Sequence, residues 1–273
     1  EHLQQNHHGA LNSDDPEYIH QMRVATRRLR AALRLFAPIL PESLAASLRL
    51  PLAALMAHLG RARDLDVLLV EIADPVLTAL PDEPRLPALA SDITNRRYAA
   101  RAQALALLAS PGYGVTLLSV LGALQPGDSG GEGNMSLRDF AQRRLRRLNR
   151  KVRRLAAAAD PEQPASLHAL RIAVKRLRYA LEFFAPLAPA KTFDRPLRRM
   201  AGAQDTLGQL NDLANAGTLL MECAGDDPRL REAVTLIGGW HGPRHAALQA
   251  SLARQRHGLT GLRLPKLAPA ARP

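Results

Sequence analysis

The stretch His20-Gln-Met-Arg23-Val-Ala-Thr-Arg27-Arg28-Leu-Arg30 returns later in the chain as His168-Ala-Leu-Arg171-Ile-Ala-Val-Lys175-Arg176-Leu-Arg178. Both copies follow the pattern H-x-x-R-x-x-x-[RK]-R-x-R, and an offset of 148 residues (168 − 20) separates them. The same offset relates Leu59-Gly60-x-x-x-Asp64-Leu65 to Leu207-Gly208-x-x-x-Asp212-Leu213. An offset that is kept over this distance indicates an internal duplication with two structurally similar halves.

The repeated stretch has the pattern of an amphipathic helix. Because each helical residue advances by about 100°, Arg23, Arg27, Arg30 and Arg34 fall within about 80° of His20. The opposite side of the helix is apolar and carries Met22, Ala25, Leu29, Ala32, Leu33 and Phe36. The second copy repeats the basic face with His168, Arg171, Lys175 and Arg178. Each copy is therefore expected to be a helix with one core face and one basic face.

The basic face of the first copy has no acidic residue between Arg23 and Arg34. Like charges three or four residues apart on a helix repel by a few tenths of a kcal/mol per pair, and solvated helices usually interleave acids on such a face. The uncompensated repulsion predicts that an anionic partner binds this face.

The charge of the whole chain agrees with that prediction. The net charge is +12 and the pI is near 11, which indicates a polyanionic partner or nonspecific adhesion. The single cysteine, Cys223, excludes an intrachain disulfide framework and a cysteine-based metal site. We find no signal peptide and no apolar run long enough to cross a membrane, so we expect a reducing, cytoplasmic setting.

The rest of the chain also has helical patterns. Residues 1–11 resemble the end of a helix. The segment Asn12-Ser-Asp-Asp-Pro16-Glu17 then has the capping residues, early proline and acid of a helix start. The helix that begins there contains the first of the two repeated stretches, which we call the signature stretches, and Pro38 ends it. Prolines between 75 and 87 predict an irregular connector, and Gly238-Gly239 predicts a break between two helices. Further helices are expected over 42–73, 88–108, 113–124, 136–159, 192–223, 227–241 and 242–262.

These elements predict an all-α fold of two antiparallel halves, each similar to a four-helix bundle. The first helical repeat is expected over 1–125 and the second over 136–262. The Gly-rich stretch 126–135 is expected to be a flexible linker, and 263–273 a loose tail.

The sequence lacks several catalytic and phosphate-binding motifs. It has no G-x-x-x-x-G-K-[ST], no G-x-G-x-x-G after a strand, no H-E-x-x-H and no G-x-S-x-G. Two interpretations remain for the cluster Arg61-Ala-Arg63-Asp64-Leu-Asp66: local ion pairing on one helix, or an Asp64 that orients a basic side chain of the signature helix from across the bundle. His20 and His168 suit an anion site, because imidazole donates hydrogen bonds and gains charge near phosphate, and arginine binds phosphate oxygens in a bidentate manner.

The two signature stretches and the Leu-Gly motifs at 59–64 and 207–212 resemble the CHAD family, the conserved histidine α-helical domain, over nearly the whole chain. The resemblance implies two antiparallel bundles related by a pseudo-twofold axis, with both signature helices facing a basic cleft or pore. It also implies binding of inorganic polyphosphate, often at cytoplasmic polyphosphate granules. Relatives often carry a triphosphatase domain, but no E-x-E-x-K motif occurs here, so we expect no such activity.

Residue by residue, the resemblance and the helix geometry give the following expected roles. The polyphosphate-binding residues are His20, Arg23, Arg27, Arg28, Arg30, His168, Arg171, Lys175, Arg176 and Arg178. Secondary contacts are expected from Arg34, Arg63, Arg143, Arg147 and Arg150. Asp64 and Asp212 are expected to orient basic side chains.

The resulting hypothesis is a non-catalytic polyphosphate-binding module that uses no cofactor and no metal and does not bind a membrane; its oligomeric state stays open. A general nucleic-acid binder is one alternative, although aromatic platforms and duplex-reading motifs are nearly absent. Another is a metal-dependent polyphosphate phosphohydrolase or phosphotransferase, or a regulator of one, for which Asp64, Asp205 and Asp212 are the candidate carboxylates.

Overall fold

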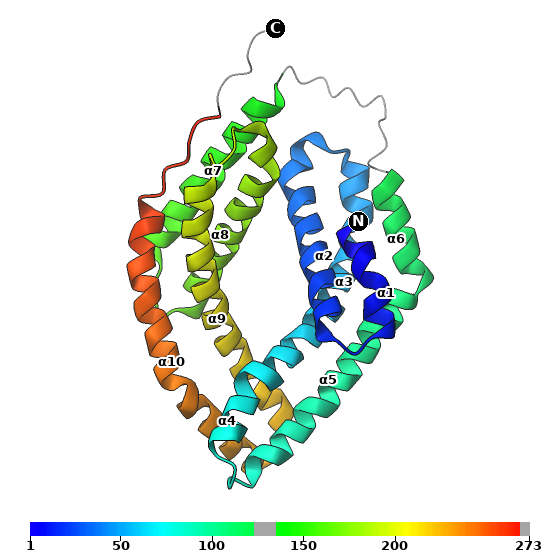
Figure 1. Cartoon of the computed structure of the whole chain (residues 1–273), viewed down its shortest axis with the longest axis vertical. Helices are drawn as coiled ribbons and strands as arrows, with labels where there is room; N and C mark the ends of the chain where they lie inside the picture. The colour runs from blue at the N-terminus through cyan, green and yellow to red at the C-terminus, as the bar shows by residue number, and fades with distance from the viewer. Residues whose placement is uncertain (123–134, 268–273) are drawn as a thin grey trace. The chain divides into compact units, whose positions relative to one another are not determined.

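A computed structural model of the chain describes residues 1–122 and 135–267, and these residues form helices and connecting turns without any strand (Figure 1). The predicted all-α fold is confirmed for this part of the chain. Most of the predicted linker, 126–134, and the end of the predicted tail, 268–273, lie outside the described residues.

The chain divides into two compact units. Unit 1 comprises Glu1–Gly130 and Asn215–His241, and unit 2 comprises Gly131–Ala214 and Gly242–Pro273. The units differ from the predicted repeats in one respect, because residues 215–241, which the repeat boundary assigns to the second half, pack in unit 1. The arrangement of the two halves around a basic cleft or pore stays a prediction.

Unit 1 is built around the pairing of its second and third helices. α2 packs against both α1 and α3, and α3 packs against α5 (Figure 1). A short connection of 13–15 joins α1 to α2, so these neighbours run antiparallel. The elements are α1 (His2–Asn12), α2 (Pro16–Phe36), the 3₁₀ turn Ala37–Ile39, α3 (Glu42–Val67), a π-helical turn (Leu68–Ala73), α4 (Asp74–Ala79), α5 (Arg85–Ala109) and α6 (Pro111–Gly122).

The core of unit 1 includes a row of leucines with helical spacing on α3. Leu48, Leu52, Leu55 and Leu59 are all buried, at intervals of three and four residues.

By length and composition, the continuous helix Glu42–Ala79 is apolar enough to span a membrane, and the bent pair of α5 and α6 passes the same test as one span. The expectation that no apolar run is long enough is wrong by this criterion. Packing inside unit 1 accounts for the buried leucines of α3.

Unit 2 contains α7 (Leu137–Ala158) and α8 (Pro164–Phe184), which pack side by side (Figure 1). The 3₁₀ turn Ala185–Leu187 follows α8. The first part of α9 (Asp194–Ala224) and the last part of α10 (Pro228–Thr260) complete the unit. The apolar side of α7 is buried at Ala141, Leu145 and Val152 and half-buried at Leu148 and Leu155.

The helix boundaries repeat at the offset seen in the sequence. α2 begins at Pro16 and ends at Phe36, and α8 begins at Pro164 and ends at Phe184. Both helices have 21 residues, and each is followed by a three-residue 3₁₀ turn. These boundaries are what a duplication would give, and the duplication itself remains a prediction.

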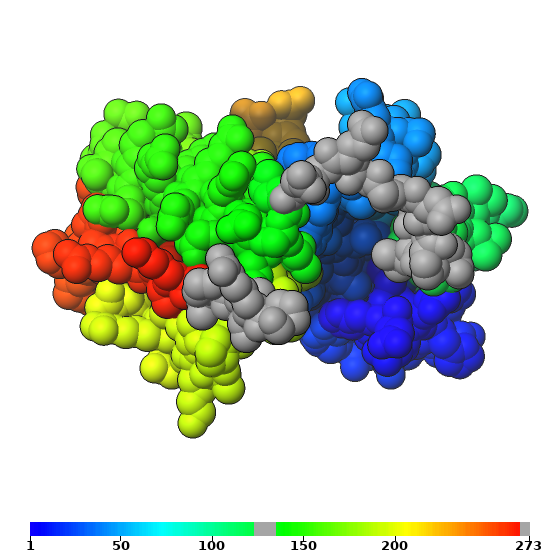
Figure 2. All heavy atoms as spheres, turned by 90° about the horizontal axis from the view of Figure 1, so that it is seen from above, coloured from blue at the N-terminus to red at the C-terminus, as the bar shows by residue number. Residues whose placement is uncertain are grey.

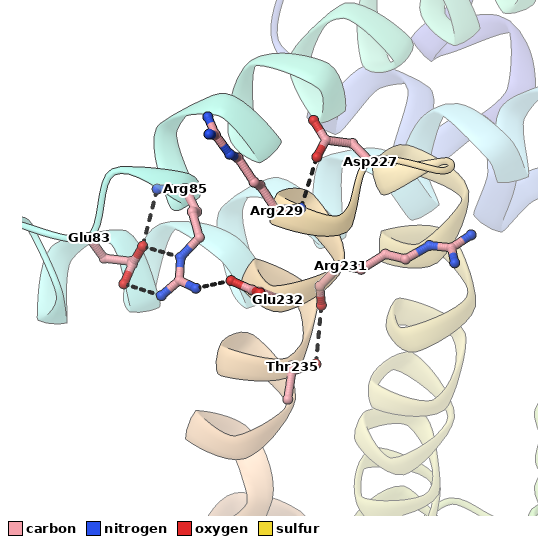
Figure 3. A network of polar contacts seen from close by, with 7 residues as sticks. All are labelled: Glu83, Arg85, Asp227, Arg229, Arg231, Glu232 and Thr235. Carbon is pink, nitrogen blue, oxygen red and sulfur yellow. Dashed lines mark hydrogen bonds and ion pairs between the residues drawn. The ribbon is translucent and has the colours of Figure 1, made fainter.

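α9 and α10 contribute to both units because they are long. Helices of 31 and 33 residues extend about 46 and 50 Å at 1.5 Å per residue. Inside unit 1, α10 is fixed by Arg85, which donates to both Glu83 and Glu232 (Figure 3). His241 Nε2 also donates to the Ile72 carbonyl oxygen at 3.0 Å.

Two of the predicted breaks are corrected by the structure. α10 continues through Gly238-Gly239 and also contains Pro243. Each glycine destabilises a helix by about 1 kcal/mol, and a proline by more. The burial of Ala233, Ile237 and His241 favours the continuous helix. The expected connector between 75 and 87 contains α4, since Pro75 occupies a first-turn position where its missing N–H costs nothing.

Candidate functional site

The first signature stretch lies on α2, whose start is fixed by a local cap. The Asp15 side chain accepts a hydrogen bond from Glu17 N at 2.8 Å, and Pro16 follows the cap directly. The core side buries Ile19, Met22, Ala25, Thr26 and Leu35. On the other side His20, Arg23, Arg27 and Arg30 are half-buried, as is Arg28, which lies about 100° around the helix from Arg27.

Arg23 is held against α3 rather than extended into solvent. Its side chain is 20% exposed, and Nη2 lies 3.7 Å from Asp64 Oδ1. Gly60 of α3 lies beside it, since a Cβ at this position would be in ordinary van der Waals contact with Arg23 Nε, at 3.7 Å. The contact between Asp64 and a signature arginine across two helices is therefore present. Its contribution to binding stays a prediction.

The other charged residues of the 61–66 cluster also contact several elements. Arg61 pairs with Glu222 of α9 at 2.8 Å, and Asp66, which is buried, accepts from Arg97 of α5 at 2.6 Å. The Arg63–Glu71 pair, at 3.6 Å, stays on the same continuous helix. Ion pairing within one helix explains Arg63, whereas contacts between helices explain the other three side chains.

His20 lies in an electropositive, partly buried position. Burial lowers its pKa from 6.5 and Arg63 of α3 lowers it further; Glu17 opposes these two effects, and Arg23 and Arg27 add smaller effects that also lower the pKa. Its Nδ1 atom is buried and has no hydrogen-bond partner among the described residues. The unliganded protein therefore favours the neutral imidazole, and an anion placed beside it would reverse that preference.

The second signature stretch lies on α8, where the histidine has a different neighbour. His168 is exposed, and its Nδ1 donates to Asn211 Oδ1 of α9 at 3.1 Å. Asn211 Nδ2 in turn donates to Asp212 Oδ1 at 3.4 Å. Since the proton is held on Nδ1, Nε2 donates to a phosphate oxygen only when the ring is protonated.

Asn211 is a residue that our sequence analysis did not place in the site. It stands 148 residues after Arg63, which neighbours the other signature histidine. The offset was the signal that could have identified it. Asp212, the predicted orienting residue, reaches His168 through Asn211.

The remaining α8 residues are half-buried: Arg171, Lys175, Arg176 and Arg178. Arg178 pairs with Glu182 one turn later at 3.0 Å, so this basic face ends in an acid, unlike that of α2. This ion pair partly neutralises Arg178.

The predicted secondary residues are spread over several elements. Arg34 and Arg30, with Arg49 of α3, line a shallow groove of about 240 Å³ at the end of α2. Arg143, Arg147 and Arg150 are exposed on α7, and within the described ranges they form no ion pair. Residues 1–122 and 135–267 contain no group of three or more His, Cys, Asp or Glu side chains that could hold a metal, so Asp64, Asp205 and Asp212 are not part of one there.

Comparison with known proteins identifies similar domains. The sequence profile of the CHAD domain matches residues 1–221. The crystal structure of the CHAD domain from the plant Ricinus communis is 35% identical, with a TM-score of 0.83 over 98% of this chain and 89% of that one. PptA from Streptomyces chartreusis has a TM-score of 0.66 over 94% and 95% of the two chains, and its 15% identity shows similarity of fold alone. No curated protein sequence matches the chain.

Proposed function

The chain belongs to the CHAD domain family, which is linked to polyphosphate, and we propose that it is a non-catalytic module that binds inorganic polyphosphate through α2 and α8. One observation carries this proposal. Each of these helices presents a histidine followed by a row of basic residues along its basic face, which we call the basic stripe. One side chain of each stripe contacts the next long helix, through Arg23–Asp64 and His168–Asn211.

Polyphosphate suits such a stripe because both have a regular spacing of charge. The basic residues of α2 from His20 to Arg34 extend about 21 Å at 1.5 Å per residue. Arginine forks bind the non-bridging oxygens in pairs, and binding removes the repulsion among neighbouring arginines. Release of counterions adds to the affinity, by analogy with nucleic acids.

The two histidines add sensitivity to charge in this proposal. A phosphate beside His20 stabilises the imidazolium that Arg63, Arg23 and Arg27 disfavour in the free protein. His168 becomes a donor to phosphate through Nε2 on protonation. In the cell, this binding would place the protein at cytoplasmic polyphosphate granules.

A competition experiment tests the proposal. Long-chain polyphosphate is bound to the protein at physiological salt, and single-stranded RNA or duplex DNA is titrated in while released phosphate is measured. We expect polyphosphate to stay bound in excess nucleic acid without hydrolysis. Easy displacement would indicate a general polyanion surface, and phosphate release that depends on added divalent metal would indicate a phosphohydrolase.

A further inference from the structure

Unit 2 has a basic pocket that contains none of the signature residues. Its volume is about 290 Å³, and it is lined by Arg195, Pro196 and Arg199 from the start of α9 and by Gly261, Leu262 and Arg263 from the segment after α10. Three of the six lining residues are arginines, and no acidic residue lines the pocket. Its walls come from two parts of the chain more than 60 residues apart.

The three arginines are uncompensated in the free protein. In the part of the chain that the structure describes, Arg195, Arg199 and Arg263 form no ion pair or hydrogen bond through their side chains. Lys191, Arg198 and Lys266 add positive charge nearby in the sequence, against Asp194 alone. Guanidinium groups that share a pocket repel one another, and an anion bound between them would remove that repulsion.

The backbone around the pocket is fixed before any ligand arrives. Asn149 Nδ2 donates to the Leu262 carbonyl at 3.1 Å, and Arg153 Nε donates to the Thr260 carbonyl at 2.7 Å. Leu267 N donates to Gln142 Oε1 at 2.7 Å, so the segment after α10 is anchored at both ends to α7. Figure 2 shows this segment (red) between α7 (green) and the start of α9 (yellow).

Two of the residues that line the pocket are packed into unit 2. Leu262 is buried, and Pro196 is buried in the first turn of α9. The backbone next to the three exposed arginines is therefore already packed, which reduces the ordering cost of binding. The start of the 31-residue α9 adds a partial positive charge from its helix dipole, in the same sense as the arginines.

We propose that this pocket is a second anion site, which takes a short phosphate chain of the size of pyrophosphate or triphosphate. Three guanidinium groups match an anion with several charges better than a single carboxylate, because each fork binds two oxygens. The volume leaves room for more than one phosphate group. The ligand is either a free oligophosphate or the end of a long chain whose interior lies elsewhere.

Inorganic triphosphate is the probe for the first test. Binding is measured by calorimetry at physiological salt for three variants: Arg195→Gln/Arg199→Gln/Arg263→Gln in the pocket, Arg23→Gln/Arg171→Gln on the signature helices, and the control Arg146→Gln/Arg154→Gln/Arg254→Gln. The control removes the same charge from exposed positions of unit 2. We expect the pocket variant to lose at least about tenfold in affinity for one site, which the other two variants keep.

Equal losses in the pocket and control variants would overturn the proposal, because general charge would then explain binding. The substituted pocket side chains have no hydrogen-bond or ion-pair partner within 1–122 and 135–267, so the thermal midpoint of the pocket variant should match that of the control. A free oligophosphate and the end of a long chain are distinguished by comparing linear triphosphate with long polyphosphate whose ends are blocked. If blocking the ends weakens polyphosphate binding to the wild type but not to the pocket variant, the chain end is the ligand of the pocket. Triphosphate binding that persists while long polyphosphate fails to bind would refute the proposed function and leave the pocket standing.

Discussion

Equivalent positions of the two signature helices have different surroundings at the level of single residues. His20 lies among Arg63, Arg23 and Arg27, whereas His168 donates to a neutral amide, Asn211. The lowered pKa of His20 means that the folded, unliganded protein disfavours its charged form. Because the unfolded chain protonates this histidine more readily, the free energy of unfolding is highest above the ordinary pKa of 6.5 and decreases as the pH falls below it.

We expect polyphosphate binding to take up protons through His20 near pH 6.5. Bound phosphate raises the pKa of the imidazole, so the complex holds more protons than the free protein and affinity rises as the pH falls from 8 towards 6. Calorimetry in buffers of different ionisation enthalpy measures this uptake. The variant His20→Asn should take up fewer protons, by up to about one per chain. Equal uptake in both proteins would assign His20 a structural role.

The two motif glycines also differ. Gly60 borders Arg23, whereas a Cβ at Gly208 would have no heavy atom within 4 Å. Packing therefore does not require a glycine at 208, and glycine within a helix costs about 0.5–1 kcal/mol relative to alanine. A ligand that approaches the α9 backbone, next to Asn211, would explain this residue.

We expect Gly208→Ala to raise the free energy of unfolding by about 0.5–1 kcal/mol and to weaken polyphosphate binding. The matched control is Gly114→Ala on α6, where an added Cβ would also have no heavy atom within 4 Å. This variant should stabilise the protein without affecting binding. Denaturant unfolding and calorimetry measure the two effects. A stabilised Gly208→Ala protein with unchanged affinity would show that the ligand does not pass over α9 at this point.

At the level of elements, the contact between α2 and α3 allows a test based on the sign of an effect. Asp64 is 42% exposed and lies 3.7 Å from Arg23, so the pair contributes little to stability, about 1 kcal/mol or less. Removal of its negative charge makes the stripe more positive, which by charge alone would strengthen binding. Loss of the orientation of Arg23 would weaken it.

We expect Asp64→Asn to weaken polyphosphate binding by about three- to tenfold, because a misplaced charged donor costs about 1 kcal/mol. Asp82→Asn is the control, since Asp82 is exposed on a turn of unit 1 and its neutralisation changes the charge equally. Calorimetry at fixed salt compares the two. If both variants bound more tightly, Asp64 would act as a surface charge only.

The sequence predicted helix limits best where they are set by residues of the helix itself. The limits of α2 follow from Asp15, Pro16 and Pro38, and the offset of 148 residues places α8 with the same limits. Sequence reasoning failed at Gly238-Gly239, because the tertiary contacts of Ile237 and His241 outweigh the local preference of glycine. The contact of His168 with Asn211 joins residues 43 positions apart, and no local pattern encodes it.

For the whole molecule, charge is distributed unevenly along the chain. Residues 1–135 carry 12 basic and 14 acidic residues, and 136–273 carry 25 and 11. A general polyanion surface would therefore concentrate binding in the second half. Specific binding by two stripes requires α2 as strongly as α8, although α2 belongs to the acidic half.

The double variant Arg23→Glu/Arg171→Glu distinguishes these two cases. Its control must remove the same charge from each unit without breaking contacts. Arg256 is unsuitable because it donates to the Ala156 and Ala157 carbonyls. Arg229 in unit 1 and Arg254 in unit 2 are exposed, and their guanidinium groups contact no acid among the described residues. Arg229→Glu/Arg254→Glu is therefore the matched variant.

We expect the stripe variant to bind long polyphosphate about a hundredfold more weakly than the control, because each reversal places a like charge against a phosphate. The slope of log affinity against log salt should fall by about two in the stripe variant, since one phosphate contact is lost at each position. Filter binding from 50 to about 300 mM salt measures both quantities. The single reversals separate the halves: if Arg23→Glu alone has no effect while Arg171→Glu carries the whole loss, the basic half binds by itself and α2 is not part of the site.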